Sequence, residues 1–217
     1  MKKLLLLTLL IISLFTLCAC PCRPLKIGSI PANRTIPQHT NTWCWAASTE
    51  MVSDYYNHRI DQCESSKFVH NNPADCSKGC PGYCSCWGAC GATIGEIENN
   101  WTHWKFKYVH TSAELSWADL EKSLSMRLFC DKSPVQVIWW WSGGGGHVVT
   151  AYGYVETPNG RFVSYYNPWP PDCSGPSNAC GSSTSGGEDA VATYEWMVST
   201  ADKRWGDSFA KFSYAGP

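Results

Sequence analysis

The sequence changes character at Pro134, and this change limits the folds that the chain can adopt. Before Pro134, apolar residues recur at helical intervals in three segments. The predicted helices run from Trp43 to about Tyr56, from about Ala92 to Trp101, and from Ser116 to about Leu128. The third helix opens with Ser116-Trp-Ala-Asp119, which is the spacing of a capping box. The first part of the chain therefore predicts a layer of helices.

After Pro134 the sequence favours strands. Val135-Gln-Val-Ile-Trp-Trp-Trp141 is rich in β-forming residues and apolar enough for a strand buried on both faces. The predicted sheet elements are Val135–Trp141, His147–Val155, Arg161–Asn167, the Trp196 region and Phe209–Tyr214. Thr157-Pro-Asn-Gly160 is a turn signal that joins two of these strands. Helices followed by such strands predict an α+β fold, with an N-terminal helical layer packed on an antiparallel β-sheet.

The N-terminus has a positive start and an apolar run that is short for a membrane span, as expected of an export signal. Leu17-Cys18-Ala19-Cys20 resembles the lipobox of bacterial lipoproteins. This resemblance implies that residues 1–19 are a removable lipoprotein signal peptide and that Cys20 carries the lipid. Cleavage after Ala19 by the ordinary signal route is the alternative, although Leu17 is a poor match to the small residue which that route prefers.

Beyond the signal, residues 20–35 contain several prolines and are predicted to be an extended tether. Residues 36–217 are then long enough for one domain with a good-sized core. The lipoprotein resemblance implies that this domain is exported and held in the cell envelope by a lipid anchor, in the periplasm, at the outer membrane or at the cell surface. A net charge of −1 and 16% charged residues provide no basic surface for nucleic acid. We expect a monomer without a cofactor.

The thirteen cysteines fall into two groups. Cys18 leaves with the signal peptide and Cys20 is lipid-bearing, so that Cys44 and ten others remain. The ten are Cys22, Cys63, Cys76, Cys80, Cys84, Cys86, Cys90, Cys130, Cys173 and Cys180. Ten is an even number, so an exported chain can form up to five disulfides and leave Cys44 as a free thiol. We therefore expect a disulfide-bonded, cysteine-rich insertion at residues 63–90, although thiolates could also bind zinc there.

The same Cys44 has the companions that a thiol nucleophile needs. Such a cysteine requires a base, a group that orients the base, and donors for the oxyanion. His147, which follows a run of four glycines, is the candidate base, and Asn167 at the end of the next predicted strand is the candidate orienting group. Gln38, six residues before Cys44, could donate its side-chain N–H to the oxyanion.

These residues resemble the papain-like cysteine peptidases. Gln38-x₅-Cys44-Trp-Ala-Ala-Ser is similar to the papain-type Gln-x₅-Cys-Trp-Ala-Phe-Ser motif, and Asn167-Pro-Trp169 matches the family's Asn-x-Trp pattern. The resemblance implies a papain-like fold and a Cys44-His147-Asn167 triad. It also implies a Trp169 ring that covers the His147–Asn167 bond, and a resting thiolate at Cys44 beside an imidazolium at His147.

The spacing is shorter than in papain, and the chain looks more like a compact bacterial branch of the fold that includes AvrRpt2-type and other C39-like peptidases. The residues that resemble this branch are Cys44-Trp-Ala-Ala with Met51-Val52, Pro134-Val135, Gly146-His147-Val-Val and Asn167-Pro-Trp-Pro. Members of this branch commonly have Asp where this chain has Asn167, so Asp172 is the reserve orienting group. The expected function is thiol peptidase activity on a protein or peptide. Two alternatives remain: another Cys-His acyl-transfer enzyme, such as a transglutaminase or amidase, and a non-catalytic binding lipoprotein.

Overall fold

The computed structural model describes residues 35–39, 42–70, 91–124, 133–169 and 187–216. The expected signal peptide, Cys20, the cysteine cluster Cys76–Cys90 and Asp172 lie outside the described residues. In the described part of the chain, no helix is both long and apolar enough to cross a bilayer.

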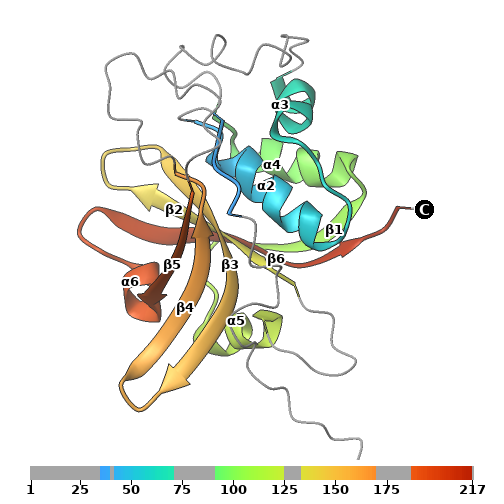
Figure 1. The fold of residues 1–217 in the computed structure, drawn as a ribbon. Coiled ribbons are helices and arrows are strands. Elements are labelled where there is room, and N and C mark those ends of the chain that lie inside the picture. Colours follow the sequence, from blue (N-terminus) through green and yellow to red (C-terminus); the bar gives the residue numbers. More distant parts are fainter. Residues whose placement is uncertain (1–34, 40–41, 71–90, 125–132, 170–186, 217) are drawn as a thin grey trace, which may run out of the picture.

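An antiparallel sheet of six strands forms the centre of the described molecule (Figure 1), in the order β1-β6-β2-β3-β4-β5. The strands are β1 (Phe106–Thr111), β2 (Val135–Trp141), β3 (Gly146–Thr157), β4 (Gly160–Asn167), β5 (Glu188–Thr193) and β6 (Lys203–Tyr214). In the β3–β4 hairpin, Thr150 lies opposite Tyr166. The first residues of β3 and the last residues of β4 therefore lie side by side at the same end of the two strands, and they include His147 and Asn167.

Helices cover both faces of the sheet (Figure 1). They are α2 (Cys44–Tyr55), α3 (Gln62–His70), α4 (Ile94–His103), α5 (Trp117–Leu124) and α6 (Tyr194–Val198). Successive strand residues point to opposite faces. Ile138 of β2 accordingly packs in the core beneath α2 and α4, whereas Val137 and Trp139 pack in the core with α5 and α6.

Helix α2 lies close against the sheet because its inner positions are small. Ala46 and Ala47 are fully buried. Beside them, the Ser48 and Thr150 hydroxyls hydrogen-bond at 2.6 Å, which joins α2 to β3. A helix held this closely fixes the position of its first residue, Cys44, relative to the edge of the sheet.

The predicted α+β class and its antiparallel sheet are confirmed. The capping interaction is also present, because the Ser116 hydroxyl donates to Asp119 at 2.7 Å and accepts from the Asp119 backbone N–H at 3.2 Å. The prediction that the Trp196 region forms part of the sheet was wrong. This region is the short helix α6, whose N-cap Thr193 accepts the Trp196 backbone N–H. Helix α3 and strands β1 and β5 were not predicted.

Candidate active site

Cys44 is the first residue of α2, and it carries a free thiol that is 8% exposed. Three backbone N–H groups approach its sulfur, from Val148 of β3, from Trp45 and from Cys44 itself. The free N–H groups at a helix start favour negative charge there. The sulfur therefore interacts with N–H groups of both α2 and β3, and Cys44 and Val148 belong to the same core cluster.

His147 is buried at the second position of β3, and its ring has a defined orientation. Its Nε2 lies 2.7 Å from Asn167 Oδ1, and the Trp169 backbone N–H donates to the same oxygen at 3.2 Å. An amide oxygen can only accept, so Nε2 carries the proton and a neutral ring has its lone pair at Nδ1. Asn167 thus selects the tautomer in which Nδ1 can act as a base.

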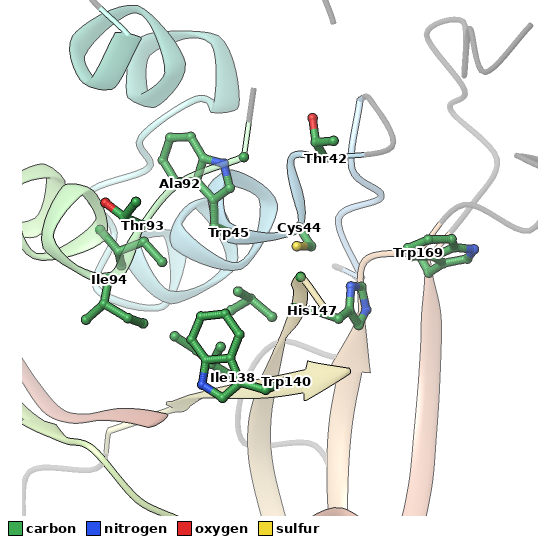
Figure 2. Close-up of a pocket in the computed structure, with 15 residues that line it drawn as sticks. Thr42, Cys44, Trp45, Ala92, Thr93, Ile94, Ile138, Trp140, His147 and Trp169 are labelled. Carbon is green, nitrogen blue, oxygen red and sulfur yellow. The ribbon is translucent and has the colours of Figure 1, made fainter. Parts of the chain in front are cut away.

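The other ring nitrogen, Nδ1, is buried, and within the described residues it has no hydrogen-bond partner. His147 and Cys44 line the same cavity (Figure 2). The Trp169 ring meets His147 edge-on, with ring centroids 5.3 Å apart. The structure therefore brings Cys44 and His147 to one cavity and joins His147 to Asn167 and Trp169, which leaves Nδ1 as the ring nitrogen without a partner.

Gln38, the predicted oxyanion donor, is 1% exposed in the irregular segment that precedes α2. Its backbone N–H donates to the Pro168 carbonyl at 2.8 Å. Pro168 stands between Asn167 and Trp169, so this bond joins the Gln38 segment to the edge of the sheet that orients His147. The Gln38 backbone is therefore held beside the segment that orients His147, although Gln38 is not among the described residues that line the cavity at Cys44.

A cavity of about 480 Å³ opens beside the thiol (Figure 2). Its walls are mainly apolar. They comprise Ile94 and Ile97 of α4, Ile138 and Trp140 of β2, and Val148 of β3. The sequence pattern places Ile138 and Trp140 on one face of a strand, but it carries no signal that α4 forms the opposite wall. These wall residues were therefore not identified from the sequence.

Burial is the largest influence on the pKa values of Cys44 and His147. It raises the pKa of the Cys44 thiol to about 11, although the three backbone N–H groups oppose the rise. Burial also lowers the pKa of His147 to about 4, although the bond to Asn167 opposes the fall. Both directions favour a neutral thiol beside a neutral imidazole. They run opposite to the thiolate–imidazolium pair that the family resemblance implied.

The pH dependence of Cys44 alkylation is expected to reflect this neutral pair. With a raised thiol pKa, the rate of reaction with iodoacetamide should rise continuously from neutral pH toward about pH 11. An unfolded-peptide cysteine, with a pKa of about 8.5, should reach its plateau earlier and serves as the reference. The measurement is the fraction of Cys44 that is alkylated in samples quenched at successive times, determined by peptide mass spectrometry at each pH. A rate already constant at neutral pH would contradict the expected direction.

Residues 33–185 match the model of the Peptidase_C39 like family. The match covers well over half of the chain, and it includes Gln38, Cys44, His147, Asn167 and Trp169. No curated protein matches the sequence.

Proposed function

Since the chain belongs to the C39-like peptidase family, whose substrates are proteins or peptides, we propose that it is a thiol endopeptidase with a Cys44-His147-Asn167 triad. One observation carries the proposal. Asn167 accepts from His147 Nε2 at 2.7 Å, and this leaves the basic Nδ1 in the cavity that holds the free Cys44 thiol. A nucleophile, a base and an orienting group then stand in the order that covalent catalysis requires.

In the proposed reaction the Cys44 sulfur attacks the carbonyl carbon of the scissile peptide bond as its proton moves to His147 Nδ1. The C–N bond then breaks, His147 returns the proton to the leaving amine, and an acyl-enzyme remains. His147 next takes a proton from water as the water oxygen attacks the thioester carbon. The C–S bond then breaks, the carboxylic acid leaves, and His147 returns the proton to the Cys44 sulfur. Burial favours the neutral form of both groups, so in this reaction proton transfer accompanies the first attack.

The oxyanion of each tetrahedral intermediate needs donors about 3 Å away. We assign this role to the Gln38 side-chain amide together with the backbone N–H of Cys44. The position of Cys44 at the start of α2 supports the second donor, because the N–H groups of a first helical turn lack partners within the helix. Gln38 is supported by its motif spacing and by its backbone bond to Pro168.

The cavity suggests which peptides are cleaved. It has about 480 Å³ of space and isoleucine, valine and tryptophan walls. A volume in this range accommodates a large apolar group with few polar anchors. We therefore propose that the substrate places a large aliphatic or aromatic side chain there, beside the scissile bond.

The test is cleavage of a peptide library by the mature wild-type protein, with epoxide-treated protein as the blank. We expect products that carry a large apolar residue near the new carboxyl end. We also expect the epoxide to label Cys44 alone. Amine-exchanged products in place of free acids would favour an acyl transferase. Absence of both labelling and cleavage would favour a binding lipoprotein.

A matched pair of variants tests the cavity itself. Ile94→Trp narrows the cavity, so kcat/KM for a bulky apolar substrate should fall by about 10-fold or more, while that for a glycine substrate changes little. Asn99→Trp adds the same ring on the exposed side of α4 and should leave both values unchanged. Equal losses on both substrates in Ile94→Trp would contradict the assignment.

We further propose that the enzyme is an exported lipoprotein of the compact bacterial branch, anchored through Cys20 in the cell envelope. The lipobox-like residues Leu17–Cys20 support this. Incorporation of radioactive palmitate into wild-type protein but not into Cys20→Ala is the expected result, and labelling of both proteins would contradict it.

A further inference from the structure

We infer that Gln62 is the residue that positions the oxyanion donor, because its side-chain amide clamps the backbone on both sides of Gln38. This inference rests on the proposed function, in which Gln38 binds the oxyanion. Gln62 is the first residue of α3 and is fully buried. It belongs to none of the motifs that the sequence shows.

The clamp consists of two reciprocal hydrogen bonds. Gln62 Nε2 donates to the Pro37 carbonyl at 3.0 Å, and Gln62 Oε1 accepts the His39 backbone N–H at 3.0 Å. The two bonded residues are the immediate neighbours of Gln38 in the chain. One side-chain amide therefore fixes the peptide units before and after the proposed donor, while the Gln38 N–H is held separately by Pro168.

The clamp is needed because Gln38 lies in no helix or strand. Residues 35–39 have irregular backbone, so that no ladder of regular hydrogen bonds sets the direction of the Gln38 side chain. Catalytic groups lose much of their effect when they are displaced by about 1 Å, and such a displacement can cost about 10²-fold in rate. The Gln62 amide provides for an irregular segment the restraint that secondary structure provides elsewhere.

Gln62 is in turn fixed to the helix that carries the nucleophile. Its Nε2 also donates to Glu50 Oε2 at 3.1 Å, and Glu50 is a residue of α2 that is 1% exposed. The Arg59 Nε donates to the other Glu50 oxygen at 2.6 Å. A buried carboxylate is costly unless it is paired and hydrogen-bonded. Arg59 and Gln62 together meet that condition, and the Gln62 amide has both N–H groups and its oxygen in use.

These bonds connect the two proposed oxyanion donors through one short path. Cys44 begins α2, Glu50 lies on the same helix, Gln62 bridges from Glu50 to the backbone, and Gln38 stands between the two bonded peptide units. The path therefore sets the distance between the Gln38 segment and the start of α2. Any change at Gln62 should affect steps that develop an oxyanion and spare steps that do not.

The test compares two reactions of Cys44 in Gln62→Met, a variant that keeps the length of the side chain and removes all three hydrogen bonds. Binding of a peptide aldehyde forms a hemithioacetal whose oxygen occupies the oxyanion site, whereas displacement of iodide from iodoacetamide develops no oxyanion. We expect aldehyde affinity and kcat to fall by about 10- to 10²-fold, with the alkylation rate unchanged. Lys67→Met, an exposed change on the same helix, should alter none of these values.

A double-mutant cycle with Gln38→Ala tests whether Gln62 acts by positioning Gln38 or by supporting the structure of the site as a whole. Gln38→Ala alone should lose about 10²–10³-fold in kcat, and adding Gln62→Met should cause little further loss, because the positioned donor is already absent. Additive losses, wild-type aldehyde affinity in Gln62→Met, or a parallel fall in alkylation would each overturn the inference while the peptidase assignment stands. If the wild-type protein neither cleaves peptides nor binds the aldehyde, the proposed function fails, and the inference fails with it.

Discussion

Replacement of Cys44 by alanine is expected to abolish peptide hydrolysis, with a loss in kcat of about 10⁶-fold, as for removal of the nucleophile from a serine peptidase triad. The reason is that no acyl-enzyme can form. The fold should persist, because Cys44 begins a helix, and alanine is smaller and has the highest helix propensity. The measurement is kcat on the best library peptide, together with far-UV circular dichroism and urea unfolding of both proteins.

The control for this substitution is Cys44→Ser, which keeps an attacking hydroxyl in nearly the same volume. Serine holds its proton far more tightly than cysteine, so the neutral His147 must remove a less acidic proton, and activity should also be very low. Both variants should still bind a peptide substrate. Hydrolysis that survives in folded Cys44→Ala would mean that another residue is the nucleophile, and the triad assignment would be wrong.

Replacement of His147 by alanine is expected to lower kcat by about 10²–10⁴-fold, which is the usual contribution of a positioned acid–base group. The loss should affect acylation, since the thiol then has no adjacent base and its own pKa is raised, and also deacylation, since no base then activates the water. Single-turnover measurements with an ester and the matching amide would locate the step. The exposed His103→Ala variant is the control and should retain full activity.

The same variant has an expected effect on stability as a function of pH. His147 is neutral in the folded protein because burial lowers its pKa from 6.5 to about 4. Between these two values the unfolded chain binds a proton there that the folded chain does not, so stability falls as the pH falls through this window. His147→Ala should lack this part of the pH dependence in urea unfolding. An unchanged dependence in the variant would mean that His147 is not held neutral by burial.

The sequence identified the chemical groups better than the elements that hold them. Gln38, Cys44, His147 and Asn167 were named from residue type, from their order and from their resemblance to the papain-type motif. The β3–β4 hairpin was predicted from its two strand-forming segments and the turn signal between them. Helix α3 was missed because its buried residues Gln62, Ser65 and Ser66 are polar, which leaves no apolar periodicity. Strand β1 was missed because it is short and half-exposed.

Helix and strand patterns are properties of neighbouring residues, so the sequence alone determined the α+β order and the helix at the thiol. The candidate triad was also named from the sequence, because each of its members lies in a short recognisable motif. Three further features are set by segments far apart in the chain: the Gln62 clamp, the cavity wall formed by α4, and the burial that raises the pKa of Cys44 and lowers that of His147. The tertiary structure alone decided these. Burial and long-range hydrogen bonds depend on which surfaces meet after the helices pack on the sheet, and residue order does not encode that in any short motif.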